Sequence, residues 1–309
     1  MHAGQLTIDA AMVRQLVDEQ YPQWVGRPVR AVASPGTVNA IFRIGDDMVA
    51  RFPLQPAEVE TTRRWLRREA AAARELAGAT RFATPQPVAI GEPGAGYPLP
   101  WTVNTWLTGT VAATQDPSRS DSYARDLAEF IQSLRSIDTH GRTFDGNNRG
   151  GDLTSRDAWM QECIDRHGRL LNGNWLSRTW AALRTLPRTT PDVMTHGDLI
   201  PANLLVNGDR LAGVLDVGDF GPADPALDIV AAWHGLETGP RHVFRGVLRC
   251  DDLEWARGAA WAFEQALGVI WYGDSNPTAS AMGRRTLARL AADFPTDRIA
   301  QSQPTGTAQ

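Results

Sequence analysis

Apolar residues recur at every second position in the segment SPGTVNAIFRIGDDMVARFP, between Ser34 and Pro53. The alternation runs from Ala40 to Ile44, is interrupted by a GDD turn, and resumes from Met48 to Phe52. A period of two is typical of strands with one buried face, and a short turn between two such runs indicates a β-hairpin. We therefore predict a hairpin over residues 34–53.

The spacing changes directly after this hairpin. The segment TTRRWLRREAAAARELAG is rich in Ala, Leu, Arg and Glu and ends at Gly78, which is typical of a helix with a glycine stop. The following TPQPVAIGEPGAGYPLPWTVNTWL returns to strand patterning, and GEPGAG at 91–96 predicts the turn between two strands. The first hundred residues thus predict the order strand, strand, helix, strand, strand.

Beyond Gly109 the pattern becomes mainly helical. DSYARDLAEFIQSLRSID places apolar residues at helical spacing, and residues 156–186 also favour helices. Asp224 followed by Pro225 predicts a helix N-cap with proline at the first helical position, and helices continue to about residue 293. We expect an α+β chain with a β-rich N-terminal lobe over 1–107, a helical lobe over 108–296 and a flexible tail over 297–309.

The composition is that of a globular protein. The chain has 309 residues, of which 42% are hydrophobic and 21% charged, and its net charge of −4 gives no electrostatic reason to expect a nucleic-acid partner. Cys163 and Cys250 form no motif, which favours a reducing compartment. The sequence predicts neither a signal peptide nor a membrane span. We expect a cytoplasmic monomer or weak dimer with no membrane partner.

Two motifs carry candidate chemistry. THGDLIPANLLV contains His196, Asp198 and Asn203, and Asp216 follows in GVLDVGDFGPADPALDIV. An H-x-D-x-x-x-x-N loop lets the Asp accept a hydroxyl proton while the Asn binds Mg²⁺, and an Asp on the next strand bridges the metal to phosphates. This spacing matches the catalytic loop of protein kinases. The apolar LLV and AGV predict paired strands that hold both loops.

These two motifs together resemble the aminoglycoside phosphotransferase family, whose fold is protein-kinase-like and which also includes macrolide phosphotransferases. The hairpin, the helix, the linker and both motifs follow in the family's order over most of the chain. The resemblance implies a two-lobed kinase-like fold with Asp198 as catalytic base. It further implies Asn203 and Asp216 as Mg²⁺ ligands, His196 as a residue that orders the loop, and Asp228 as a residue that ties the loop together.

The spacing after the second motif separates this chain from protein kinases. Asp228 follows Asp216 by only twelve positions, which leaves no room for an activation loop, and no A-P-E follows. A kinase of small molecules is therefore favoured, with ATP or GTP as phosphate donor and Mg²⁺ as cofactor.

The nucleotide side departs from the kinase pattern. Kinases hold the phosphates with a strand lysine that pairs with a helix glutamate. The second hairpin strand, MVARFP, offers Arg51 instead, which can clamp phosphate but differs from lysine in geometry. We expect Glu69 as its partner, with Glu60 and Glu75 as alternatives. The turn around Gly36 is expected to cover the phosphates through backbone N–H groups.

The nucleotide base is expected at the link between the lobes. In VNTWL, residues 103–107, the segment around Asn104 and Trp106 would offer backbone groups to a purine. Neither a Walker A sequence nor a Rossmann fingerprint occurs in the chain.

Acceptor recognition in the family is assigned to the helical lobe. Between Asp219 and Asp274 the chain has nine acidic residues and four arginines, and an acidic cleft would concentrate a cationic substrate. The candidate acceptor-binding residues are Asp219, Glu237, Glu264 and Trp271. Several aromatic residues in this region keep a bulkier, less charged acceptor such as a macrolide open. The loop NNRGGD at 147–152 is expected to be structured, without an assigned role.

The motifs predict a nucleoside-triphosphate-dependent O-phosphotransferase, and the resemblance to the family implies that it acts on a hydroxyl of an aminoglycoside antibiotic and confers resistance. A macrolide 2'-phosphotransferase and a kinase of an amino alcohol or sugar are the alternatives. A ligand-binding relative without activity is disfavoured, because all three catalytic oxygen donors are present.

Overall fold

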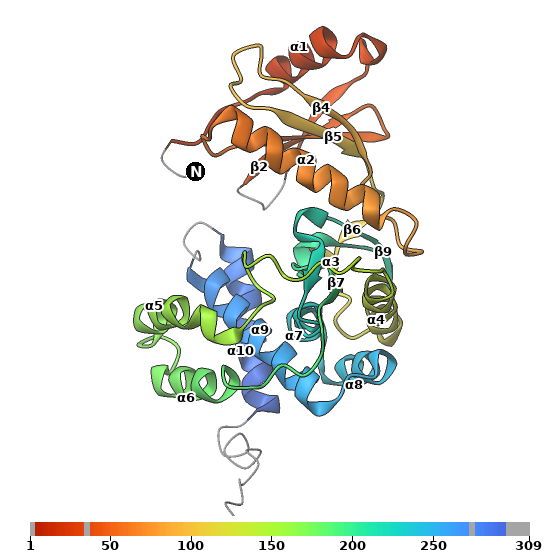
Figure 1. Cartoon of the computed structure of the whole chain (residues 1–309). Coiled ribbons are helices and arrows are strands. Elements are labelled where there is room, and N and C mark those ends of the chain that lie inside the picture. The colour runs from red at the N-terminus through yellow and green to blue at the C-terminus, as the bar shows by residue number, and fades with distance from the viewer. Residues whose placement is uncertain (1–3, 34–37, 272–275, 295–309) are drawn as a thin grey trace, which may run out of the picture. The chain divides into compact units, whose positions relative to one another are not determined.

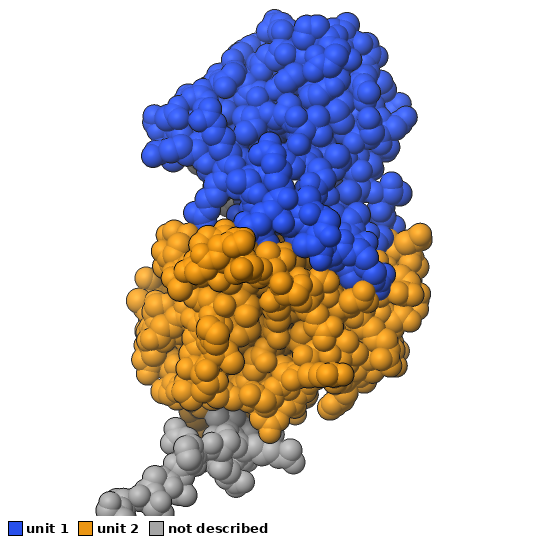
Figure 2. Space-filling view, turned by 45° about the vertical axis from the view of Figure 1, so that its right-hand side comes forward, with its two compact units in different colours: residues 1–110, 212–220 blue, residues 111–211, 221–309 orange. Residues whose placement is uncertain are grey.

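The computed structural model describes residues 4–33, 38–271 and 276–294. The chain divides into two compact units, coloured separately in Figure 2. Unit 1 comprises residues 1–110 and 212–220, and unit 2 comprises residues 111–211 and 221–309. Within the described ranges, no helix combines the length and the apolar character needed to cross a membrane.

Unit 1 is built on a five-stranded antiparallel sheet with the strand order β1-β2-β3-β5-β4; Figure 1 labels β2, β4 and β5. Its elements are α1 (Ala10–Gln20), the 3₁₀ turn η1 (Pro22–Trp24), β1 (Val29–Val32), β2 (Asn39–Ile44), β3 (Met48–Pro53), α2 (Val59–Leu76), β4 (Pro87–Gly91), β5 (Trp101–Thr105) and η4 (Val217–Asp219). The expected hairpin, the helix that ends before Gly78 and the two later strands are confirmed.

The period of two gives the sheet of unit 1 two different faces. Phe52 and Trp101 stack with ring centroids 4.8 Å apart on the face that packs against α1, where they form part of the core. Arg51 points to the other face, because it lies one position before Phe52 in β3, and it lines a hollow together with residues of α2. One strand therefore contributes both to the core and to a candidate site.

Unit 2 is mainly helical (Figure 1). Its elements are α3 (Ala112–Gln115), α4 (Asp121–Arg135), η2 (Leu153–Arg156), α5 (Asp157–His167), α6 (Gly173–Leu183), β7 (Val193–Thr195), η3 (Pro201–Asn203), β8 (Leu204–Asn207), β10 (Gly221–Ala223), η5 (Leu227–Ile229), α7 (Val230–Gly235), α8 (Thr238–Leu248), α9 (Asp252–Trp271) and α10 (Pro277–Asp293). The chain passes between the units at β6 (Thr110–Val111) and inside β9 (Arg210–Val214). Helix α9 is buried along most of its length and packs against α5, α6, α7 and α10.

Two features of the fold differ from the sequence prediction. Helix α1 and strand β1 precede the hairpin and were not expected. Asp224 is no helix N-cap: a turn follows it, the 3₁₀ turn begins at Leu227, and α7 begins at Val230. The Asp224 carboxylate is used instead to accept hydrogen bonds from Arg257 and Trp261, which fixes the backbone here by tertiary contacts.

Candidate functional site

The loop from His196 to Asn203 connects β7 to β8 in unit 2, and the side chain of Asp228 holds its backbone by hydrogen bonds. The two Asp228 carboxylate oxygens accept hydrogen bonds from the backbone N–H groups of His196, at 2.8 Å, and Gly197, at 3.0 Å. Asp228 is 1% exposed; burial raises its carboxyl pKa, while the His196 side chain and the two N–H donors oppose that rise. The loop conformation therefore depends on a residue of η5, which follows it in the chain by more than twenty positions.

Within this loop, Asp198 and Asn203 contact each other directly. Asn203 Nδ2 donates to Asp198 Oδ2 at 2.9 Å and to the Asp198 carbonyl oxygen at 3.0 Å. The backbone N–H of Asp198 donates to His196 Nδ1 at 3.3 Å. The structure thus brings together four of the residues named from the sequence, His196, Asp198, Asn203 and Asp228, in one unit.

Two further side chains, which the sequence analysis did not identify, bind the Asp198 carboxylate. Arg149 Nη2 donates to Asp198 Oδ1 at 2.9 Å and to the Gly197 carbonyl oxygen at 3.3 Å. Gln265 Nε2, from the middle of α9, donates to the same Oδ1 at 2.6 Å. Among the described residues, Oδ1 therefore accepts two hydrogen bonds and Oδ2 accepts one, from Asn203, so one lone pair of Oδ2 has no donor there.

Arg149 is followed in the NNRGGD loop by Gly150, whose conformation and close packing fit glycine. Gly150 has φ +113°, and a Cβ there would lie 2.6 Å from the Ala223 Cβ. The Gly150 carbonyl oxygen accepts a hydrogen bond from the Asp224 N–H at 2.8 Å. The two consecutive glycines were the available signal for a functional loop, but nothing in the sequence indicates which side chain they position.

We expect Gly150→Ala to destabilise the protein by about 2–3 kcal/mol, because the new methyl group overlaps Ala223 at a φ that L residues avoid. Gly146→Ala is the matched control: Gly146 also has a positive φ, +86°, but open space surrounds its Cβ position, so only about 1 kcal/mol is expected. Urea unfolding of both variants measures the difference. Equal losses in the two variants would contradict the close packing of the NNRGGD loop.

Unit 1 holds the candidate phosphate-binding residues. Arg51 Nη2 lies 3.3 Å from Asp216 Oδ1, and Arg51 Nη1 lies 4.0 Å from Glu69 Oε2. Asp216 has φ 57° and ψ 62°, a left-handed conformation that is uncommon for a residue other than glycine and clusters at functional sites. Of the three glutamates considered as partners of Arg51, Glu69 is the one that the structure places beside it.

Glu69 lies in a crowded and partly negative environment. Burial raises its pKa to about 7, Arg51 opposes this rise, and the charges of Asp216 and Asp219 add to it. The Glu69 side chain approaches η4 so closely that a Cβ at Gly218 would lie 2.5 Å from Glu69 Oε1. The glycine after Val217 is therefore explained by the packing of α2 against η4.

Two further residues of the nucleotide prediction, Asn104 and Trp106, lie in unit 1. Asn104 lines the same hollow as Arg51, Glu69 and Asp216. The Trp106 ring lies 4.8 Å below the guanidinium of Arg43. Gly36 lies outside the described residues.

The candidate acceptor residues do not form one cluster. Glu264 has a side chain that is 2% exposed and accepts both Nε and Nη2 of Arg156 on Oε1, at 2.9 and 2.7 Å. Glu237 pairs with Arg289 at 2.6 Å. Trp271 packs beside Trp159 in unit 2, with ring centroids 5.4 Å apart. Asp219 belongs to unit 1, where it lies close enough to Glu69 to act on its pKa.

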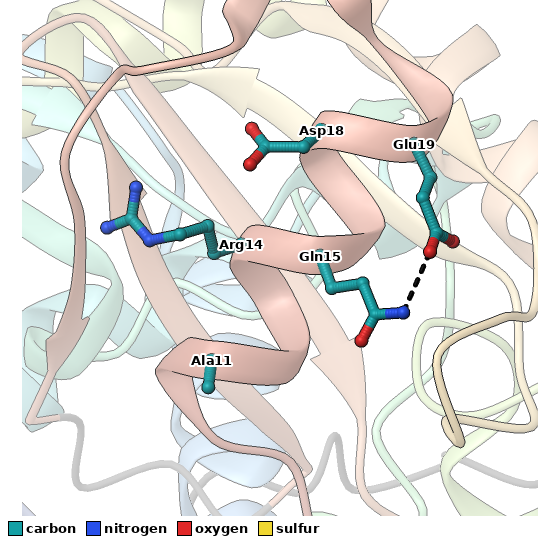
Figure 3. Close-up of a pocket in the computed structure, with 5 residues that line it drawn as sticks. All are labelled: Ala11, Arg14, Gln15, Asp18 and Glu19. Carbon is teal, nitrogen blue, oxygen red and sulfur yellow. Dashed lines mark hydrogen bonds between the residues drawn. The ribbon is translucent and has the colours of Figure 1, made fainter.

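A second hollow lies on the outer surface of α1 and shares no residue with these sites. Figure 3 shows its lining residues, Ala11, Arg14, Gln15, Asp18 and Glu19, all on one helix. Gln15 Nε2 donates to Glu19 Oε1 at 2.8 Å across one helical turn. These are solvated side chains of an amphipathic helix, and their arrangement does not indicate a catalytic or ligand-binding site.

The sequence and the fold of this chain are similar to those of known phosphotransferases. A family model described as "Phosphotransferase enzyme family" matches residues 30–261. An aminoglycoside 3'-phosphotransferase from Salmonella typhimurium is 26% identical over 142 residues, 44% of this chain and 52% of that protein. The chain thus matches about half the length of this relative.

Two solved structures show the same fold. The GDP complex of wild-type aminoglycoside 2'-phosphotransferase-IIIa matches with a TM-score of 0.70 at 18% identity, covering 93% of this chain and 100% of that one. A macrolide 2'-phosphotransferase from Brachybacterium faecium, solved as the apoenzyme, matches with a TM-score of 0.61 at 21% identity, covering 91% and 98%. The expected kinase-like α+β fold is confirmed.

Proposed function

The chain belongs to the phosphotransferase enzyme family, and from this premise we propose that it transfers the γ-phosphoryl group of ATP or GTP to a hydroxyl of an aminoglycoside. Unit 1 binds the nucleotide and unit 2 supplies the base and the acceptor-binding surface. Transfer of this kind requires positioning and charge neutralisation more than covalent chemistry. Such an enzyme confers resistance to its acceptor, and its need for a nucleoside triphosphate fits a cytoplasmic location.

The observation that carries this proposal is the Asp198 carboxylate. Its Oδ1 accepts Arg149 and Gln265, and its Oδ2 accepts Asn203, so the side chain is held in one orientation with one acceptor position left over. A carboxylate held in this way can accept the proton of a hydroxyl as that oxygen attacks phosphorus. We therefore assign Asp198 as the base, with His196 and Asp228 holding its loop.

The donor atoms of Asn203 and Asp216 fit Mg²⁺. Asn203 uses its Nδ2 on Asp198, and the described residues give its Oδ1 no donor, so this oxygen is available to a cation. The Asp216 side chain is 48% exposed and carries a second hard oxygen ligand. A bound Mg²⁺ would neutralise phosphate charge, and phosphate oxygens and water would complete its shell, since the described chain holds no cluster of three or more metal-ligating side chains.

Arg51 is assigned to the phosphates, with Glu69 beside it and Asn104 and Trp106 toward the base. Arg51→Met is expected to raise the KM for the nucleotide about tenfold, the effect of one charge-assisted hydrogen bond of about 1.5 kcal/mol. Arg63→Met is the control, because Arg63 also pairs with two carboxylates of unit 1, Glu60 and Glu92, but has no contact with Asp216. Initial rates over a range of nucleotide concentrations measure both. A KM that rises equally in the two variants argues against this assignment.

A macrolide acceptor is the second candidate, and one feature of unit 2 favours it. The carboxylates proposed for a cationic acceptor include Glu237 and Glu264, and both are paired with arginines. Trp159 and Trp271 form an aromatic pair in the same unit, with the Arg166 guanidinium 4.2 Å over the Trp271 ring. Such a surface suits a bulky apolar molecule better than a polycation.

The test is a transfer assay with ATP and with GTP in the presence of Mg²⁺, using kanamycin, erythromycin, ethanolamine and glucose as acceptors. Detection of the phosphorylated acceptor by mass spectrometry separates transfer from hydrolysis of the nucleotide. Phosphorylated kanamycin supports the proposal, and phosphorylated erythromycin in its place moves the acceptor to the macrolide class. Binding of nucleotide without transfer to any of the four acceptors would overturn it.

A further inference from the structure

A row of buried polar side chains leads from the interior of unit 2 to Asp198. Thr286 Oγ1 on α10 lies 2.9 Å from His234 Nδ1 on α7, and His234 Nε2 lies 3.0 Å from Gln265 Oε1 on α9. Gln265 Nε2 then reaches Asp198 Oδ1 at 2.6 Å. Thr286, His234 and Gln265 are 0%, 2% and 4% exposed, so water does not compete for these contacts.

The direction of every hydrogen bond in this row follows from the carboxylate at its end. Asp198 Oδ1 accepts from Arg149, so the Gln265 group that faces it is the NH₂, and Gln265 Oε1 faces His234. An amide oxygen only accepts, so His234 Nε2 carries the hydrogen. A neutral imidazole then has an unprotonated Nδ1, which accepts the hydroxyl hydrogen of Thr286 at 2.9 Å; the other acceptor near this hydroxyl, the Trp233 carbonyl oxygen, is farther away at 3.5 Å.

The charge state of His234 agrees with this assignment. Burial lowers its pKa to about 3; the hydrogen bond with Gln265 opposes this, and the charges of Arg149 and Arg289 add to it. His234 is therefore neutral at physiological pH and has one donor and one acceptor nitrogen. A protonated ring would have two donors and would compete with the Thr286 hydroxyl hydrogen.

A purely structural role would not require this arrangement. Gln265 lies in the middle of α9 among buried apolar residues, where a leucine would pack without a hydrogen-bonding requirement. A series of buried polar side chains costs free energy unless all its members are paired. Here each side chain is hydrogen-bonded to the next, which restricts the orientation of both. Of the three side chains, Gln265 is the one that contacts the candidate site, through its hydrogen bond to Asp198.

We propose that Thr286, His234 and Gln265 form a positioning relay that fixes the orientation of the Asp198 carboxylate, so that Oδ2 faces the acceptor hydroxyl. The proposal rests on the assignment of Asp198 as the base of the proposed phosphoryl transfer. Through the relay, the Thr286 hydroxyl holds His234 Nδ1, the Nε2–H of His234 holds the Gln265 amide oxygen, and the Gln265 NH₂ holds Asp198 Oδ1. The three residues touch neither nucleotide nor acceptor and act through Asp198.

Thr286→Val tests the relay, because it keeps the side-chain volume and removes the hydroxyl that is hydrogen-bonded to His234 Nδ1. The buried Nδ1 of His234 then has lost its partner, the imidazole and the Gln265 amide are held less firmly, and kcat is expected to fall about tenfold, part of the 10²–10⁴-fold that a positioned base contributes. The KM for the nucleotide is expected to stay unchanged, since Arg51 and Glu69 lie in the other unit. Thr179→Val is the matched control: Thr179 is 1% exposed on α6, and its hydroxyl has no hydrogen-bond partner in the described part of the chain.

A second measurement needs no activity. In ¹⁵N NMR spectra of the full-length protein, His234 is expected to show the neutral tautomer protonated on Nε2 between pH 6 and pH 8, with its signals assigned by their loss in His234→Gln. Thr286→Val is expected to shift the side-chain NH₂ signals of Gln265, and Thr179→Val is not. In activity, His234→Gln should retain more kcat than His234→Leu, because an amide NH₂ can replace the Nε2 donor.

The outcomes separate the relay from the proposed function. If wild type transfers phosphate to no acceptor, the proposed function fails, and the NMR spectra alone decide the relay. A charged His234, an imidazole protonated on Nδ1, or Gln265 signals that do not respond to Thr286→Val would overturn it. In an active enzyme, a kcat that falls equally in Thr286→Val and Thr179→Val would also overturn it.

Discussion

Asp198→Asn is expected to lower kcat about 10³-fold, which lies within the range that a positioned general base contributes. The substitution keeps the shape of the side chain but replaces one carboxylate oxygen with an NH₂ group. Oδ1 faces two donors, Arg149 and Gln265, so the remaining oxygen of the amide will take that position. The NH₂ group then replaces Oδ2 and faces Asn203 and the acceptor, where a proton acceptor is needed.

The KM for the nucleotide should change little in this variant, because the interaction lost is one made in the transition state. Asp157→Asn is the control: the Asp157 carboxylate also accepts an arginine, Arg184, and a second N–H donor, from Trp180, but it has no contact with the site. Steady-state rates with a saturating acceptor and circular dichroism of the folded proteins complete the comparison. If Asp198→Asn retained wild-type kcat, Asp198 would not be the base.

The local elements of this protein could be predicted from sequence because each has a period and a stop of its own. Helix α2 ends just before Gly78, and the β2–β3 hairpin turns at Gly45 where the alternation is interrupted. Helix α1 has similar signals of its own. Val13, Leu16 and Val17 have the spacing of a buried helix face, and the Asp9 carboxylate caps the first turn through the N–H groups of Ala11 and Met12.

The candidate site was predictable only where it is contiguous. His196, Asp198 and Asn203 lie within one loop, and their spacing is itself the signal. Arg149 and Gln265 reach the same carboxylate from 49 and 67 positions away, and no pattern along the chain links them to it. The assignment of residues 212–220 to unit 1 is non-local in the same way, because it follows from packing of η4 on α2 and of Gly213 beside Ala83.

Charge counting along a segment also omits tertiary pairing. The stretch from Asp219 to Asp274 has an excess of carboxylates, but Glu237 pairs with Arg289, Glu254 with Arg135 and Glu264 with Arg156. All three arginines lie outside the stretch. The excess of negative charge in the sequence therefore overstates the field that a cationic acceptor would meet in unit 2.

Asp224→Asn is expected to give the largest loss of stability, about 3–5 kcal/mol, because it leaves a buried arginine without its counter-charge. Asp224 and Arg257 are 1% and 4% exposed. Asp224 Oδ2 accepts Arg257 Nε at 3.0 Å and Trp261 Nε1 at 3.0 Å, and Oδ1 accepts the N–H of Ala226 at 3.0 Å. An amide in this position retains one acceptor oxygen and no charge, and its NH₂ group would face a donor on one side.

The loss should depend on burial and on the arginine, and both can be varied separately. Asp252→Asn removes the partner of Arg245 at the surface, where the Asp252 side chain is 99% exposed, and should cost less than about 1 kcal/mol. In the double variant Asp224→Asn, Arg257→Met, the buried charge is gone, so the free energy of unfolding should recover part of the loss seen in the single variant. Urea unfolding of the wild type, Asp224→Asn, Arg257→Met, the double variant and Asp252→Asn measures these differences. If the double variant lost more free energy of unfolding than the losses of the two single variants added together, Asp224 would stabilise unit 2 by another route than neutralising Arg257.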